Sequence, residues 1–316
     1  MTLPAHLQVI ANRWDSTTLG TELALLAETL SRQYGNAVVG TLYYGSCLRK
    51  GDPSDGLVDL YLIVDGYRSV YGFSSRALLN WLLPPNVFYL ELEAPQGRVR
   101  AKYALLSLPQ LKRGTSRWLQ PYLWGRFAQP TALISSRDES AAQTLLETMG
   151  QAVLRFIAAT LPLLPRRFNA RDLWEQGLAR SYATELRAEN RGRQAELFWA
   201  DPAYYTALTA ATLASSRFPV HQDGDSPDAA YVSEYSLSTR QLARAAWYLR
   251  RLQGRTLHLL RLLKGLFTFS GGVDYVLWKL ERHSGIRMEA SDRVRRHPLI
   301  FGWGLAWRLY RRGAFR

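Results

Sequence analysis

The stretch that decides the fold is Tyr43–Asp65, YYGSCLRKGDPSDGLVDLYLIVD. An apolar run over Ala37–Tyr44 leads into it and is typical of a strand that ends at Gly45-Ser46. A polar loop containing Gly and Pro comes next, and a second β-rich run carries Asp59 and Asp65 on the two-residue period of a strand. The sequence therefore predicts two strands joined by a Gly-Ser turn and a loop, with acidic residues on the second strand.

This layout is that of the nucleotidyltransferase superfamily, although an ordinary hairpin with common turn residues would also explain it. A triphosphate needs backbone N–H groups and a hydroxyl at close range, which Gly45-Ser46 can supply. The leaving pyrophosphate needs Mg²⁺, which prefers carboxylate oxygens such as those of Asp59. An aspartate inside an apolar strand is costly unless it is paired or metal-bound. The second carboxylate usual in the superfamily would fall at Tyr61.

Other acidic residues compete for the role of second metal ligand. Asp65 lies six residues beyond Asp59, about 20 Å along a strand, which is too far for one ion without a bend. Asp55 lies in the loop and can fold back, so we favour it. Glu91 and Glu93 share one face of a predicted strand, where they would otherwise be exposed edge-strand charges.

Length and composition bound the protein class. The chain has 316 residues, enough for two domains with separate cores, and 47% hydrophobic with 12% aromatic residues indicates a folded protein. The one cysteine, Cys47, excludes an internal disulfide and fits a reducing cytosol. No apolar run reaches the roughly 18–20 residues of a transmembrane helix, and Met1–Ile10 lacks the pattern of a signal peptide. We therefore expect a soluble or peripheral protein. The five histidines lack the ligand spacing of a zinc site.

The net charge of +14 favours an anionic partner, either nucleic acid or anionic lipid. Most of the excess lies in Arg250–Arg316, which contains fifteen basic and four acidic residues. Its end, Arg293–Arg316, mixes aromatic residues with a basic fringe, which is typical of an amphipathic segment in a lipid interface. The alternative is a helix packed on the core with exposed arginines.

The periodicity predicts an α+β chain, a small mixed sheet with flanking helices followed by mostly helical structure. Thr17 or Thr18 is the expected cap of the second helix. The predicted helices are Leu3–Trp14, Thr18–Tyr34, Ser74–Trp81, Glu139–Leu161, Ala170–Asn190, Pro202–Leu213 and Ser238–Leu263. Val87–Glu93 and Arg98–Ser107 are predicted to pair as strands, and Arg217–Ser233 is predicted to be a loop. We expect a catalytic domain at residues 1–134, a mostly helical domain at 135–237, and a long helix with a basic, aromatic membrane-interface segment at 238–316.

Six motifs follow one another in a recognisable order. They are Tyr44-Gly45-Ser46 with Asp59; Asn86-Val87-Phe88-Tyr89; Lys102-Tyr103 with Leu106-Ser107; Trp118, Tyr122, Gly125-Arg126 and Gln129-Pro130; Leu161-Pro162, Asp172-Leu173 and Ser181-Tyr182; and Lys264-Gly265-Leu266-Phe267-Thr268. Together they resemble the mitochondrial-type phosphatidate cytidylyltransferases, the translocator assembly and maintenance family. The chain departs from the family at Cys47, at Leu60 and Leu62, and at Ala183-Thr184, and Gly66–Ser75 lacks the family's Asn-rich stretch.

The resemblance implies a nucleotidyltransferase fold that transfers CMP from CTP to phosphatidic acid, giving CDP-diacylglycerol and pyrophosphate. It implies Mg²⁺ held by Asp59, with Asp55 as the favoured candidate for the second ligand. Lys102 and Arg126 would neutralise phosphate charge, with ordinary salt bridges as their alternative. The residues expected to contact CTP are Tyr44, Gly45, Ser46 and Lys264, the last with the lipid head group as a second possible contact.

The implied location is a peripheral one on an anionic membrane surface, at the cytoplasmic face or the matrix face of the mitochondrial inner membrane. No nucleic-acid partner is expected. Two alternatives stay open: a nucleotidyltransferase acting on RNA, and a non-catalytic membrane-associated protein with the same fold.

Overall fold

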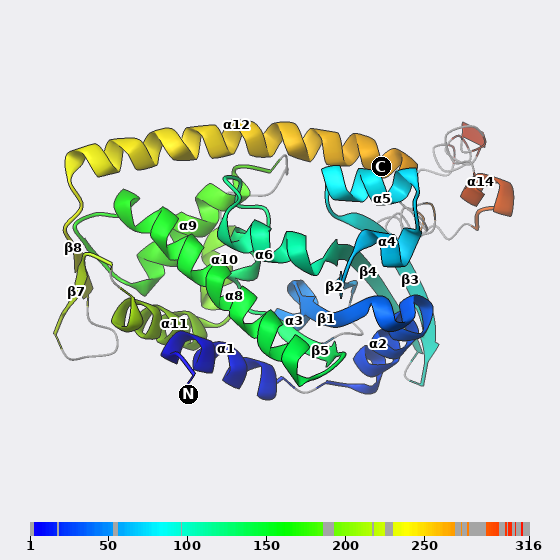
Figure 1. The fold of residues 1–316 in the computed structure, drawn as a ribbon, viewed down its shortest axis with the longest axis horizontal. Coiled ribbons are helices and arrows are strands. Elements are labelled where there is room, and N and C mark those ends of the chain that lie inside the picture. Colours follow the sequence, from blue (N-terminus) through cyan, green and yellow to red (C-terminus); the bar gives the residue numbers. More distant parts are fainter. Residues whose placement is uncertain are drawn as a thin grey trace.

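The computed structural model describes residues 3–17, 19–52, 56–95, 97–185, 193–216, 218–224, 230–268 and 289–296, with single positions at 273, 277, 301, 303, 304, 307 and 311. The fold is α+β: a mixed sheet flanked by helices, joined to a helical layer later in the chain (Figure 1). This confirms the fold class predicted from the sequence.

The main sheet has five strands in the order β3-β4-β2-β1-β5. β2 and β4 run parallel, while the other neighbouring pairs are antiparallel. The parallel pair places the start of β2 beside the middle of β4, which brings Asp59 opposite Lys102. The strands are β1 (Val38–Tyr44), β2 (Val58–Val64), β3 (Asn86–Ala94), β4 (Gly97–Ser107) and β5 (Ala132–Ser136).

The two faces of this sheet belong to two buried clusters, because strand side chains alternate in direction. Leu60, Leu62 and Val64 of β2 pack in one cluster, together with residues of the helices on that face. Those helices are α2 (Thr21–Tyr34), α4 (Tyr67–Tyr71) and α5 (Ser75–Leu82). Tyr61 and Ile63 point to the other face and join the larger cluster, which extends through the helical layer.

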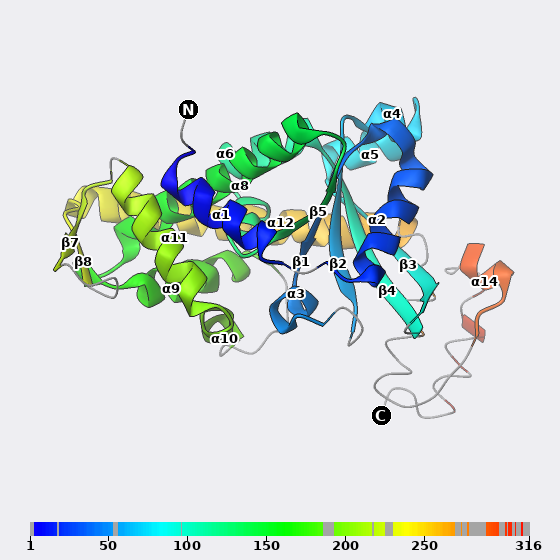
Figure 2. The same cartoon turned by 90° about the horizontal axis from the view of Figure 1, so that it is seen from below.

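The helical layer covers part of that second face (Figure 2). Its members are α1 (Ala5–Asp15), α6 (Leu108–Ser116), α7 (Trp124–Phe127), α8 (Glu139–Thr160), α9 (Ala170–Tyr182), α10 (Arg193–Trp199) and α11 (Pro202–Ser215). A three-stranded sheet, β6-β8-β7, closes its far end, with β6 (Arg167–Phe168), β7 (Val220–Asp223) and β8 (Ala230–Ser233). The buried cluster is continuous across residue 134, and the division of the chain into three domains stays a prediction.

The long helix α12 (Leu237–Thr268) runs along one side of the molecule, from β8 to α5 (Figure 1). Trp247 anchors it, because its side chain is buried and its Nε1 donates a hydrogen bond of 2.8 Å to the Ala159 carbonyl. A short helix, α14 (Asp292–Arg296), follows later. Most of the predicted interface segment, Arg293–Arg316, lies outside the described residues. Within the described part of the chain, no helix is both long and apolar enough to cross a bilayer.

The structure corrects several local predictions. The residues after Gly45-Ser46 form a short helix, α3 (Ser46–Lys50), where the sequence predicted a loop. Gly20 is the N-cap of α2, with no side-chain cap hydrogen bond, so the predicted threonine cap is wrong. The predicted loop Arg217–Ser233 contains β7 and β8, which pair as antiparallel strands, with β7 mostly exposed and Tyr231 and Ser233 of β8 buried. Helix α9 ends at Tyr182, well before the predicted end at Asn190.

Candidate functional site

Asp59 lies where three strands of the main sheet come together. It is directly opposite Tyr44 of β1 on one side and Lys102 of β4 on the other. The Lys102 Nζ is 3.7 Å from the Asp59 Oδ1, and the two side chains are 33% and 24% exposed. The carboxylate is therefore paired with a cation and still accessible to a ligand. A partner of this kind is what an aspartate in an apolar strand requires.

Gly45 joins β1 to α3 directly beside this carboxylate. Its φ of 94° and ψ of −161° belong to a backbone region that is essentially restricted to glycine. A Cβ placed on Gly45 would lie 2.7 Å from the Asp59 Oδ2. Two independent constraints therefore require glycine here, and the absent side chain lets the turn approach the aspartate closely.

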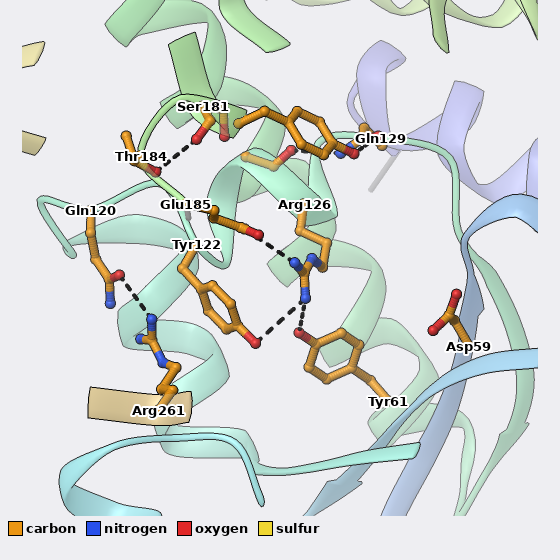
Figure 3. A network of polar contacts seen from close by, with 12 residues as sticks. Asp59, Tyr61, Gln120, Tyr122, Arg126, Gln129, Ser181, Thr184, Glu185 and Arg261 are labelled. Carbon is orange, nitrogen blue, oxygen red and sulfur yellow. Dashed lines mark hydrogen bonds and ion pairs between the residues drawn. The ribbon is translucent and has the colours of Figure 1, made fainter. Parts of the chain in front are cut away.

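Tyr61 occupies the position two residues after Asp59, on the same face of β2. Its hydroxyl accepts a hydrogen bond of 2.9 Å from the Arg126 guanidinium. Arg126 also forms an ion pair of 3.2 Å with Glu185, and these two side chains are 15% and 10% exposed. The guanidinium carbon lies 5.8 Å from the centre of the Tyr44 ring. Figure 3 shows the Tyr61 hydroxyl beside the Arg126 guanidinium. The position where the superfamily usually has its second carboxylate is therefore hydrogen-bonded to a buried cation.

A second arginine, Arg261 of α12, extends this polar network (Figure 3). Its guanidinium lies 4.0 Å from the centre of the Tyr122 ring, and it donates to the Gln120 side chain and the Pro84 carbonyl. Burial alone would raise the pKa of the Tyr122 phenol, but Arg126 and Arg261 outweigh burial and lower it. Tyr122 is therefore a phenol held in a positive field, which marks this region as one that favours negative charge.

Lys264 lies one helical turn beyond Arg261 and is only 7% exposed. Its ammonium donates hydrogen bonds to the carbonyls of Leu83 and, at 2.8 Å, of Pro85. Burial and the charge of Arg261 lower the pKa of Lys264 to about 8. These contacts join α12 to the turn before β3. The predicted contact of Lys264 with phosphate stays a prediction.

The candidates for a second metal ligand differ in their positions and contacts. Asp55 lies outside the described residues. Asp65 follows the opposite end of β2 and accepts a hydrogen bond of 2.6 Å from the Gly66 backbone. Glu91 is ion-paired with Arg98 and Arg100, and Glu93 with Arg98, so both edge-strand glutamates have cationic partners.

Asp59 fits a magnesium site of the kind that uses one protein carboxylate. Magnesium in such sites is held by one or two carboxylates, substrate phosphates and water. Among the residues that the structure describes, no group of three or more His, Cys, Asp or Glu side chains is arranged for a metal. Beside Asp59, such an ion would take its other ligands from a second carboxylate, from substrate phosphates and from water.

Of the site residues predicted from the sequence, the structure brings Asp59, Gly45 and Lys102 together. Arg126 is linked to them through Tyr44 and Tyr61. The contacts of Arg126 with Glu185 and Tyr122 were not predicted from the sequence. Glu185 lies 59 residues from Arg126, and no local pattern in the sequence indicates that pairing.

No protein-family model matches the chain, and no curated protein matches it significantly. The family resemblance therefore rests on the ordered motifs alone.

Gly45→Ala should disturb the site more than a matched glycine change. Gly51 also has a positive φ, of 70°, but open space around its missing Cβ. Gly51→Ala should therefore cost only backbone strain, about 1–2 kcal/mol. Gly45→Ala should cost more, because the new Cβ also collides with Asp59. Urea unfolding of the two variants tests this, and equal losses of stability would contradict the close approach.

The stability of the protein should depend on pH through Lys264. Its pKa is about 8 in the folded protein against an ordinary lysine value of 10.5, so between these pH values the unfolded state binds more protons. The free energy of unfolding should therefore rise with pH in this window, by at most about 1.4 kcal/mol per pH unit, because the charged form is penalised below pH 8. Lys264→Met should lack this rise. If the free energy of unfolding changes with pH in the same way in the wild-type protein and in Lys264→Met, Lys264 is not the source of the rise.

Proposed function

We propose that the protein is a nucleotidyltransferase that transfers CMP from CTP to phosphatidic acid, giving CDP-diacylglycerol and pyrophosphate. The observation that carries the proposal is the junction of β1, β2 and β4. There a glycine turn of restricted conformation touches an accessible aspartate whose partner is a lysine on the parallel strand. The ordered motifs supply the substrate pair, since the geometry by itself favours only phosphate chemistry.

The cationic surroundings support a polyanionic substrate. Lys102 lies beside Asp59, and Arg126 and Arg261 lie on either side of Tyr122. Phosphoryl transfer depends mainly on positioning and on neutralising charge at the phosphates. Fixed guanidinium groups provide this with little reorganisation, because Arg126 is already held by Glu185 and Tyr61.

The reaction is a direct displacement. A phosphate oxygen of phosphatidic acid attacks the α-phosphorus of CTP, a new P–O bond forms, and the bond from that phosphorus to the pyrophosphate oxygen breaks. The nucleophile is already anionic near neutral pH, so no strong general base is needed. The Gly45-Ser46 turn would position the triphosphate, and Lys102 and Arg126 would balance the charge of the phosphates.

Asp59, with Asp55 as the predicted second ligand, would hold Mg²⁺. When bound, this ion supplies charge neutralisation at the triphosphate and the leaving pyrophosphate.

Exposed apolar side chains beside basic residues support a membrane-bound substrate. One face of α5 exposes Leu78, Trp81 and Leu82. The second half of α12 lies next to it, since Arg261 and Lys264 bind the carbonyls that follow α5. This half exposes further leucines, and α12 contains seven basic residues and no acidic one. Apolar side chains with a cationic fringe suit an anionic lipid surface.

Pyrophosphate release tests the proposal. Purified protein with Mg²⁺ should release pyrophosphate from CTP only when phosphatidic acid is present in mixed micelles. Asp59→Asn should lower the rate at least about 100-fold, as the loss of one preorganised electrostatic group does. Asp65→Asn, at the other end of the same strand, is the matched control and should keep the wild-type rate. No release with any of the four nucleoside triphosphates would overturn the proposal in favour of a non-catalytic binding protein.

Trp81→Ala should weaken binding to anionic vesicles. Trp81 is 55% exposed in the α5 surface, whereas Trp199 of α10 is 57% exposed in the helical layer, away from α5 in both views (Figures 1 and 2). Loss of one large apolar contact should raise the vesicle dissociation constant about tenfold for Trp81→Ala, and leave it unchanged for Trp199→Ala. Equal effects in a flotation assay would exclude α5 as the contact surface.

A further inference from the structure

A cavity of about 470 Å³ lies between the end of α9 and the first half of α12. Its walls include Arg180 and Gln176 from α9, and Arg244, Tyr248 and Arg251 from α12. This volume is in the range of small-molecule sites. The cavity shares no lining residue with the junction around Asp59, so any ligand here would occupy a separate site.

Three arginines face this cavity from two helices. In the part of the chain that the structure describes, none of the three forms a hydrogen bond or ion pair with an acidic side chain. Other arginines in the molecule do have acidic partners: Arg126 pairs with Glu185, and Arg171 with Glu175. Like charges gathered without a counter-charge repel one another, so such an arrangement is stable only at a cost.

Arg180 is the least exposed of the three arginines. Its Nε is buried and has no hydrogen-bond partner among the described residues. Burial, and then repulsion from Arg244 and Arg251, lower the pKa of Arg180. An oxyanion in the cavity would lie beside the guanidinium groups that line it and relieve their mutual repulsion.

The remaining wall is aromatic. Trp247 is 6% exposed and fixed by its hydrogen bond to Ala159, so it forms a rigid floor. Tyr248 is 70% exposed at the rim. Guanidinium groups beside aromatic rings bind phosphate through charge-assisted forks and hold an attached apolar or planar group against the rings.

We propose that this pocket binds a phosphate group, through Arg180, Arg244 and Arg251, with the rest of the ligand against Trp247 and Tyr248. The phosphate belongs either to a lipid head group or to a soluble phosphate compound. The proposal does not depend on catalysis at Asp59, because the two sites have no residue in common.

Arginine modification by phenylglyoxal, mapped by mass spectrometry, tests the pocket in the full-length protein. Three additions are compared with buffer of equal ionic strength: inorganic phosphate, phosphatidic acid vesicles and phosphatidylcholine vesicles. Phosphate in the pocket should slow modification of Arg180, Arg244 and Arg251 severalfold. Arg255, exposed on α12 and outside the pocket lining, is the internal control and should react at an unchanged rate. Protection by inorganic phosphate would identify a soluble ligand, and protection by phosphatidic acid vesicles alone would identify a lipid head group.

Variants separate a pocket from a flat charged surface. In the Arg244→Gln variant, protecting Arg180 should require about tenfold more of the added phosphate compound, because one charge-assisted contact is lost. Arg255→Gln removes the same charge from the same helix and should leave that protection unchanged. Equal protection of Arg255 and the three pocket arginines, equal effects of the two variants, or no protection by any addition would each overturn the proposal.

Discussion

The buried ion pair between Arg126 and Glu185 is the interaction on which the arrangement of the site depends. It joins α7 to the segment after α9, and through Tyr61 it connects both to the central strand of the sheet. A buried guanidinium is tolerated only when its donors are satisfied, and removing one partner of such a pair typically costs about 3–5 kcal/mol. The sheet and the helical layer are thus held in register at the point where phosphate chemistry is proposed.

Close packing at the other end of the site depends on one missing side chain. Gly45 lets the turn after β1 reach the Asp59 carboxylate, while Lys102 balances its charge from β4. The two features are coupled, because the strand pairing that places Lys102 opposite Asp59 also places Tyr44, and hence the turn, on the other side. The turn proposed to bind phosphate and the carboxylate proposed to bind metal are therefore close enough to contact the same substrate.

Helix α12 places its positive charge in two different settings and adds an apolar surface. Arg261 and Lys264 are buried and bound to backbone carbonyls, which fixes the helix to the turn after α5. Arg244 and Arg251 face the cavity beside α9 without acidic partners among the described residues. The exposed leucines of the same helix form part of an apolar surface with α5. One basic helix thus combines a structural role with two proposed roles in binding anions.

The sequence by itself determined the strands around Gly45-Ser46, the placement of Asp59, the pairing of β3 with β4 and the long helix near the C-terminal end of the described chain. These features follow from local periodicity and from turn residues, which act over a few positions. Tertiary structure alone decided that Glu185 meets Arg126, that Lys264 binds carbonyls, and that Arg180 faces Arg244 and Arg251. Such contacts join residues far apart in the chain, and they are set by how helices pack against the sheet. Local patterns carry no information on that packing, which is why charge pairing and the second pocket emerge only from the folded molecule.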